Sequence, residues 1–493
     1  MERHVFFVSL SVLLARLFRN IHNLAAALIK PTIRPISHIA PHYREYPLRL
    51  LVPVSRIIAF IDSFHHPNPP LIKKPWVTKL PCVALGLVLC PELVMGATFT
   101  LDSHLDSPPS YVQYSAAPHP IEKILMDSLY AIREKRMDTA LHGIETLIEK
   151  KPEFRLAQLI YGDLLSSKGQ WITNLGNYPN APRDKLLGLR EEIHQRVKHY
   201  SYRPDPNTLP SYLIRPGNGL ARLVIVDIDQ SRLYVFEHHR GRIRLRGDYY
   251  TSVGKNGFPK QSEGDQKTPI GLYLTTKGIS SDKLPARYGI AAFPVDYPNK
   301  WDKRLGRTGH GIWIHGVPPD TYSRPPRSSD GCIAIANEDL LSVKDMLAVP
   351  NTPVIITEHI SWTDRREIAV RRNRFEVQFD RWRRDWESRD NGRYAGHYSR
   401  DFENETRDRA SWLEHKQRVN SQKQYIEVSV SNLSILGYPG EPDIVEVTFD
   451  QNYRSSNYNF RGKKRQYWRK ENDGKKNGVE ENGVWRIVYE DTF

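Results

Sequence analysis

The chain has 493 residues, of which 39% are hydrophobic and 10% aromatic, so it can form several domains and is not a disordered chain. The formal net charge is +15, but residues 1–97 hold 11 Lys or Arg against 4 Asp or Glu, which leaves +8 over the remainder. A surface this mildly basic argues against a charge-driven nucleic-acid-binding protein. It suits a polyanionic surrounding, or a solvated surface with no specific partner.

The first predicted element is a secretory signal at residues 71–97. Three lysines precede an apolar run at 80–89, and the small residues Gly96 and Ala97 follow it, which is the order of a signal peptide. The run is shorter than the roughly 20 apolar residues that span a bilayer. We therefore expect export to the periplasm or cell envelope, with residues 1–70 a mis-assigned or disordered extension. A membrane anchor at the N-terminus is the alternative.

An α-helical region is predicted at residues 120–200, after a Ser- and Pro-rich linker at 98–119. Apolar residues recur there at spacings of three and four in four successive runs. The helix pairs resemble a tetratricopeptide-type unit, and one such unit cannot bury both of its faces. We expect this region to pack on a neighbouring domain or to bind a protein partner.

Residues 218–358 show the alternating period of β-strands and predict a mainly β domain, joined to the helices by the linker "YRPDPNTLP". Residues 220–254 alternate around turns at 229–230 and 240–241, which indicates consecutive antiparallel strands. Further strands are expected after "SEGDQKTP", in "GIWIHG" and at 352–357.

The last third, residues 365–493, predicts an α+β domain. Its opening helix carries an aromatic stripe at spacings of four and three, formed by Phe375, Phe379, Trp382 and Trp386, and such a stripe is expected to face a core. Four strand patterns follow it. The stretches "WRRDWESRDNGRYAGHYS" and "SWLEHKQRV" resemble the nuclear-transport-factor/SnoaL-like superfamily, which implies a cone-shaped α+β fold without fixing a function.

Cys332, in "SSDGCIAIAN", is the candidate nucleophile. The two other cysteines lie in the expected signal, so this thiol has no partner in an oxidising compartment. A thiol needs a base near neutral pH, and His315 in "GIWIHG" is the candidate. The loop of Pro, Ser and Arg residues between them can fold back, so that the strands "IWIH" and "CIAIA" become neighbours. We expect the imidazole to lie within hydrogen-bond reach of the sulfur.

The pair "IHG…SSDGCIAIAN" resembles the signature of the L,D-transpeptidase catalytic domain, and "EGDQKTPIGLY" resembles its upstream turn and strand. This resemblance covers residues 220–357. It implies a cysteine peptidyl transferase acting on peptidoglycan stem peptides, which releases D-alanine and passes the acyl group to another stem. Transfer to water instead would be L,D-carboxypeptidase trimming.

The resemblance also implies roles for the residues around this pair. The carbonyl of Gly316 would orient His315, and backbone N–H groups near Gly331 and Cys332 would form the oxyanion hole. Gly331 allows a tight turn, and Ser329 is expected to hold that turn by a local hydrogen bond.

Two arginines in the intervening loop, Arg324 and Arg327, are candidates for contacting substrate carboxylates. The sequence departs from many members of the family it resembles at two positions. Asp330 stands where many have His or Arg, and Ala334 stands where many have Arg or Asn. The variant resembles a branch of cell-shape-determining trimming enzymes, some of which carry a similar C-terminal cone. A non-catalytic scaffold that binds the cell wall is the third alternative.

No cofactor is expected, and no His, Cys or Asp cluster has the spacing of a metal site. The oligomeric state is left open.

Overall fold

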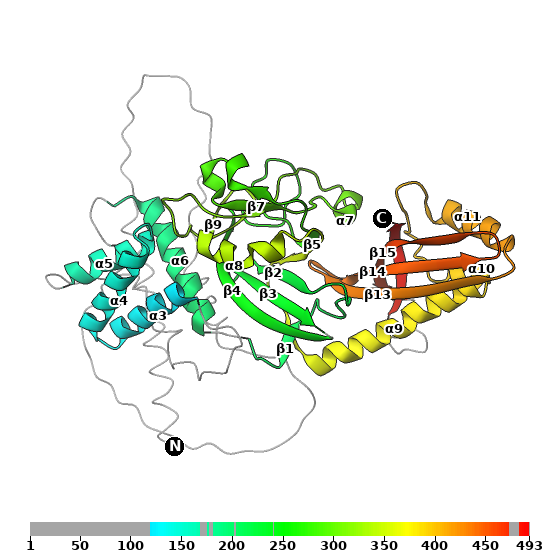
Figure 1. Ribbon diagram of the computed structural model, residues 1–493, viewed down its shortest axis with the longest axis horizontal. Coiled ribbons are helices and arrows are strands. Elements are labelled where there is room, and N and C mark those ends of the chain that lie inside the picture. Colours follow the sequence, from blue (N-terminus) through cyan, green and yellow to red (C-terminus); the bar gives the residue numbers. More distant parts are fainter. Residues whose placement is uncertain are drawn as a thin grey trace, which may run out of the picture. The chain divides into compact units, whose positions relative to one another are not determined.

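The computed structural model describes residues 119–167, 175–176, 181–201, 204–239, 241–472 and 483–492 (Figure 1). All of them belong to one compact unit, Val94–Phe493. The expected extension at 1–70, the signal at 71–97 and the linker up to 118 lie outside the described residues. Within the described part, none of the helices has the length and apolar character needed to cross a bilayer.

The predicted helical region is present. Its helices are α3 (Pro120–Arg133), α4 (Met137–Lys150), α5 (Arg155–Ser166) and α6 (Arg183–Ser201). Their apolar faces form one buried cluster, and that cluster also contains Tyr322 and Ala336 of the central domain. The ring of Tyr322 lies 4.6 Å from that of Phe154. The helices therefore pack on the neighbouring domain, which was one of the two expectations for the face that a single helical unit leaves uncovered.

The central domain is a mainly β domain, as predicted. In sheet order its strands are β5 (Gly271–Leu274), β11 (Pro353–Thr357), β2 (Arg222–Asp227), β3 (Arg232–His239), β4 (Arg242–Gly254), β10 (Ile333–Ile335), β8 (Trp313–His315), β7 (Ala291–Pro294) and β6 (Ile279–Ser280), and β9 (Arg327–Ser329) pairs with β4. β2, β3 and β4 are the consecutive antiparallel strands that the alternation predicts. β10 and β8 run parallel, with Ile333 opposite Ile314 and Ala334 opposite His315.

Two elements of the central domain were not predicted. Residues 337–347 form a helix, α8 (Asn337–Leu347), whose buried Leu340, Val343 and Leu347 join the core of the sheet. Part of the expected linker is a strand, since β1 (Thr208–Pro210) pairs with β12 (Trp362–Asp364). This short ladder ties the segment before the sheet to the segment after it.

The C-terminal domain has the predicted helices-then-sheet order. It contains α9 (Arg365–Glu387), α10 (Asn391–Ala395), α11 (Arg409–Ser421) and the antiparallel strands β13 (Ile426–Tyr438), β14 (Glu441–Ser455), β15 (Asn459–Glu471) and β16 (Val484–Thr492). Asp364 caps α9, accepting a hydrogen bond from the Arg366 N–H. Helix α9 runs alongside this sheet (Figure 1), and its aromatic stripe is buried in the core of the domain, as expected.

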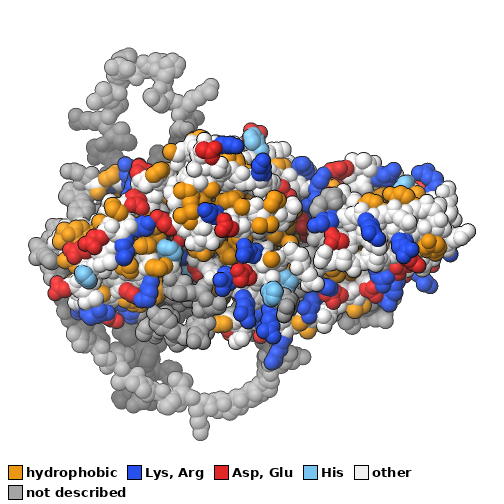
Figure 2. Space-filling view, in the orientation of Figure 1, with side chains coloured by type: hydrophobic (Ala, Val, Ile, Leu, Met, Phe, Trp, Pro, Cys, Tyr) orange, Lys and Arg blue, Asp and Glu red, His pale blue; other side chains and the backbone are white. Residues whose placement is uncertain are grey.

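Charges of both signs are interspersed over the face seen in Figure 2. This distribution agrees with the mildly basic composition. It does not form the single-sign stripe that is typical of nucleic-acid-binding domains.

Candidate active site

The candidate nucleophile Cys332 follows a turn that only glycine can make easily. Gly331 has a φ of +118°, and a Cβ on it would lie 2.7 Å from the carbonyl oxygen of Lys267. That oxygen belongs to the "QKTP" turn, and Thr268 of the same turn donates its hydroxyl to the Gly331 carbonyl at 3.0 Å. Close backbone approach and a positive φ together explain why a glycine precedes the cysteine.

Ser329 holds this turn with two hydrogen bonds. Its Oγ accepts from the Gly331 N–H at 3.1 Å and donates to the Cys332 carbonyl at 2.6 Å. The Gly331 N–H, one of the two groups expected to form an oxyanion hole, is therefore already engaged in a hydrogen bond to the Ser329 side chain. In this state Gly331 supports the turn instead of facing a substrate.

His315 ends β8, and the structure fixes its tautomer. Its Nδ1 lies 2.6 Å from the carbonyl oxygen of Gly316, which can only accept, so Nδ1 carries the hydrogen and Nε2 keeps a lone pair. Only 2% of the residue is exposed. Burial lowers the pKa of His315 to about 4, and the charges of Arg324 and Arg287 act in the same direction. The ring is therefore a neutral base at pH 7.

The Cys332 thiol is also neutral at rest. Burial raises its pKa, with the Trp313 N–H and the charge of Arg324 acting weakly in the opposite direction. Its Sγ donates to the carbonyl oxygen of Gly311 at 3.3 Å. Among the described residues, no hydrogen bond joins this sulfur to His315, so the thiol must leave Gly311 to reach the imidazole. Such contacts are often loose before substrate binds.

Both side chains nevertheless line one pocket of about 490 Å³. The parallel pairing of β10 with β8 places Ala334 opposite His315 and so puts Cys332, two residues earlier, on the same face of the sheet. A pocket of this size is typical of a small-molecule or peptide site.

The structure brings one of the two candidate arginines into this pocket. Arg324 lines it and donates to the Ser328 carbonyl oxygen, while burial lowers the pKa of its guanidinium. Arg327 is exposed on β9 and is not among the lining residues. Its neighbours on β9, Ser328 and Ser329, do line the pocket, so the contact of Arg327 with substrate stays a prediction.

Two neighbours of the histidine were not singled out from sequence. Asn337 accepts from the Val317 N–H at 3.1 Å and donates to the Val317 carbonyl at 2.9 Å, so it clamps the segment that follows Gly316. The ring of Tyr288 meets the His315 ring edge to face at 5.0 Å. Asn337 is the last residue of the "SSDGCIAIAN" stretch, and its place beside the candidate nucleophile was the feature of the sequence that could have identified it.

The part of the chain that the structure describes contains no group of three or more His, Cys, Asp or Glu side chains placed to hold a metal ion. His315 and Cys332 are instead surrounded by backbone amides and carbonyls and by a few cationic side chains.

Comparisons with known proteins identify two domains of the chain. Residues 221–356 match the L,D-transpeptidase catalytic domain family, and residues 374–490 match the Cds6 C-terminal NTF2-like domain family. A search of curated proteins gives no match.

Two solved structures resemble the chain over more than half of its length. One is Bd1075 of Bdellovibrio bacteriovorus, 29% identical, covering 58% of this chain and 98% of that one, with a TM-score of 0.50. Another is Pgp2 of Campylobacter jejuni, described as a helical cell shape determining protein, 25% identical, covering 55% and 91%, with a TM-score of 0.46.

Residues 221–356 are thus an L,D-transpeptidase catalytic domain and residues 374–490 an NTF2-like domain, and the family of the first domain supports a peptidoglycan-acting enzyme, a transpeptidase or a carboxypeptidase.

Proposed function

We propose that this chain is an exported cysteine peptidyl transferase that cleaves the terminal D-alanine from peptidoglycan stem peptides. The observation that carries the proposal is that His315 ends β8 and Cys332 immediately precedes β10, the parallel strand beside it, and that both side chains line one pocket. Export is supported by the order of residues in 71–97, and in an oxidising compartment an unpaired thiol such as that of Cys332 is a liability unless its chemistry is used.

The first half-reaction forms a thioester. The Cys332 sulfur bonds to the carbonyl carbon of the third-position diamino acid while His315 Nε2 takes the thiol proton. Since both groups are neutral at rest, this proton moves as the S–C bond forms. The C–N bond to D-alanine then breaks, and the imidazolium returns the proton to the leaving amine.

Gly316 has a positioning role in this scheme. Its carbonyl accepts from Nδ1 at 2.6 Å and so keeps the lone pair of Nε2 directed at the pocket. The same carbonyl stabilises the imidazolium that forms during attack, in place of a carboxylate.

In the second half-reaction an amine of another stem attacks the thioester carbonyl and loses its proton to His315. The C–S bond then breaks, the imidazolium returns the proton to the Cys332 sulfur, and the new amide bond is the cross-link. Attack by water instead releases a tripeptide. This trimming reaction is the second candidate, favoured by the position of Ala334. Ala334 is buried opposite His315, so at this position β10 offers only a methyl group, where a polar side chain could hold an acceptor amine.

The test is to incubate the purified full chain with a disaccharide tetrapeptide and follow the products. Free D-alanine with a cross-linked dimer indicates transpeptidation, free D-alanine with tripeptide alone indicates trimming, and no D-alanine contradicts the proposal in favour of a binding scaffold. Cys332→Ala should lower turnover by at least about 1,000-fold, as loss of a nucleophile does. Its melting temperature should match that of the wild type, because the thiol makes a single weak hydrogen bond.

A further inference from the structure

The catalytic pocket has a wall that does not come from the catalytic domain. Lys185, Leu189 and Glu192 of α6 line the same pocket as Cys332, and Arg155 of α5 does so as well. Spacings of four and three place the three α6 residues on one face of the helix. The helical region therefore borders the reacting groups directly.

A glycine in α6 allows this close approach. A Cβ on Gly188 would lie 2.7 Å from Cγ of Pro325, in the loop that joins His315 to Cys332. Glycine inside a helix costs about 1 kcal/mol relative to alanine. Here it lets the helix backbone rest against the loop.

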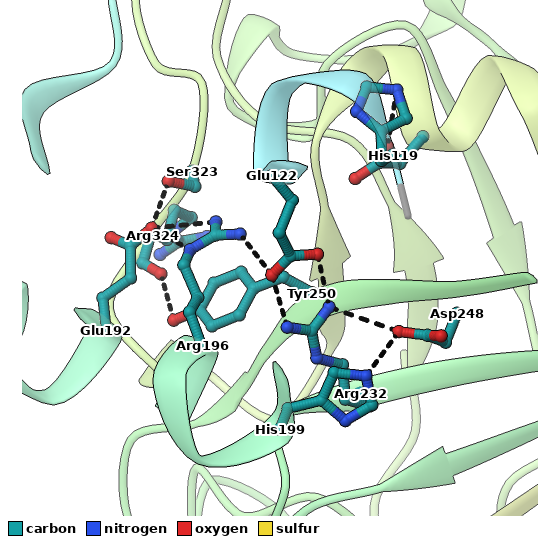
Figure 3. Close-up of polar contacts among 11 residues, drawn as sticks. His119, Glu122, Glu192, Arg196, His199, Arg232, Asp248, Tyr250, Ser323 and Arg324 are labelled. Atoms are coloured by element: carbon teal, nitrogen blue, oxygen red, sulfur yellow. Dashed lines mark hydrogen bonds and ion pairs between the residues drawn. The ribbon is translucent and has the colours of Figure 1, made fainter. Parts of the chain in front are cut away.

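One turn further along α6, Glu192 fixes the helix to the same loop. Its Oε1 accepts from Ser323 Oγ at 2.6 Å and from the Arg196 guanidinium at 2.9 Å (Figure 3). Arg196 lies over the ring of Tyr250 at 3.9 Å, and the Tyr250 hydroxyl donates to the Arg324 carbonyl at 2.9 Å. These contacts hold α6 and Arg324 in a fixed relation.

The charged side chains that line the pocket differ in whether they form ion pairs. The two acidic side chains, Glu192 and Asp330, are paired with Arg196 and Lys255, at 2.9 Å in each case. Lys185 and Arg155 are exposed, and neither has an ion pair with any of the described residues. The pocket is thus left with cationic groups on the side that the helical region supplies.

We propose that Lys185 and Arg155 bind a carboxylate of the peptide substrate, so that the helical region is a specificity-determining wall of the active site. The inference rests on the proposed function, which supplies a substrate with several carboxylates. Lysine and arginine form charge-assisted hydrogen bonds to carboxylates, and Arg can do so with two parallel bonds. Leu189, which lines the same pocket, offers an apolar surface to the peptide.

The first measurement is the rate of D-alanine release by the full chain with the disaccharide tetrapeptide. The double variant Lys185→Ala/Arg155→Ala should raise KM roughly threefold to tenfold and leave kcat within about twofold, since the contacts lie away from the scissile bond. Lys198→Ala is the matched control, because it removes a cation of the same helix that is engaged with Asp229 at 3.5 Å. A double variant with unchanged KM would overturn the proposal.

A second substrate isolates the charge. A tetrapeptide whose side carboxylates are converted to carboxamides should bind the wild type more weakly, and the double variant should no longer distinguish it from the acidic form. Equal discrimination by both proteins would contradict a role for these cations.

Binding to the Cys332→Ala chain separates this proposal from the proposed function. In one outcome the wild type releases no D-alanine, yet the tetrapeptide binds Cys332→Ala several-fold more tightly than the triple variant that also carries Lys185→Ala and Arg155→Ala. Carboxylate binding by the helical region is then supported, and the enzymatic proposal fails. If the wild type is active and the two dissociation constants are equal, carboxylate binding by Lys185 and Arg155 is contradicted and the enzymatic proposal is supported.

Discussion

Two buried polar regions of this molecule lie close together in the chain's fold but differ in how their charges are compensated. Where the helices meet the central sheet, Glu122 receives hydrogen bonds from Arg232 at 2.8 Å and from Arg196 at 3.3 Å (Figure 3). In the catalytic pocket, His315 is buried and Cys332 is half-buried, and the hydrogen bonds that they donate go to backbone carbonyls.

The pKa values follow this difference. Burial alone would raise the pKa of Glu122, but the charges of Arg232 and Arg196 outweigh it and hold the pKa at about 2. Burial of His315 outweighs the opposing effect of its hydrogen bond to the Gly316 carbonyl, and its pKa falls to about 4. A compensated charge stabilises the fold when its partners stay in place, whereas an uncompensated group stays neutral and available for proton transfer.

The largest expected effect comes from breaking the compensated region. Glu122→Gln should lower the free energy of unfolding by about 3–5 kcal/mol, because it leaves the fully buried Arg232 without its main counter-charge. Urea denaturation measures it. Glu134→Gln is the control, since Glu134 and Arg136 form an exposed pair that should contribute less than about 1 kcal/mol. Equal effects of the two substitutions would show that the buried pair is not special.

The same carboxylate should make the free energy of unfolding fall as the pH is lowered. The pKa of Glu122 is lowered in the folded state, so its contribution is complete above its ordinary pKa and is lost as the pH falls toward about 2. The Glu122→Gln chain should lack this part of the acid loss. Parallel pH dependence of the two proteins below pH 4.5 would exclude the assignment.

The second effect concerns the uncompensated region. Because the neutral ring is the base and the pKa of His315 is about 4, kcat/KM should fall with acid near pH 4 and not near 6.5. Arg324→Ala should move this limb to higher pH, since the charge of Arg324 helps to lower the pKa. Alkylation of Cys332 by iodoacetamide should have its midpoint above the ordinary thiol pKa, because burial raises it. An acid limb near 6.5 would mean that the ring is solvated during catalysis.

A third substitution tests the turn before the cysteine. Gly331→Ala should cost about 1–3 kcal/mol and reduce D-alanine release, because the new Cβ meets the Lys267 carbonyl at a φ of +118°. Gly241→Ala is matched to it, having a φ of +76° with open space around its Cβ position, and should cost less. Urea denaturation and the release assay measure both, and a Gly331→Ala chain with wild-type activity would contradict the described turn.

The smallest effect is expected at the clamp behind the histidine. Asn337→Ala removes two hydrogen bonds to Val317, each contributing about 1 kcal/mol, and should lower kcat roughly threefold to tenfold by loosening the Gly316 carbonyl. Asn256→Ala removes a comparable amide contact from an exposed loop and should leave kcat unchanged. A fall in stability without any change in kcat would limit Asn337 to a structural role.

Much of the fold could be predicted because its signals are local. The period of apolar residues predicts α3 to α6, the aromatic stripe predicts the buried face of α9, and the alternation predicts β2 to β4. The adjacency of the strands that carry His315 and Cys332 could also be predicted, from the loop that joins them.

What could not be predicted depends on contacts between segments far apart in the sequence. The hydrogen bond from Ser329 to the Gly331 N–H and the direction of the Cys332 thiol toward Gly311 depend on the folded turn. The approach of α6 to the pocket depends on Gly188 meeting Pro325, 137 positions later, and no periodicity encodes that contact. Arg324 and Arg327 look alike in sequence, but in the folded chain Arg324 lines the pocket and Arg327 is exposed and does not.

The central claim is that the sulfur of Cys332 carries the acyl group of a stem peptide. Intact-mass spectrometry of the full chain mixed briefly with the disaccharide tetrapeptide, followed by peptide mapping, tests this most directly. We predict an adduct equal to the substrate less D-alanine, located on the peptide that contains Cys332 and absent from the Cys332→Ala chain. D-alanine release with no adduct on that peptide, and with undiminished turnover by Cys332→Ala, would contradict the account.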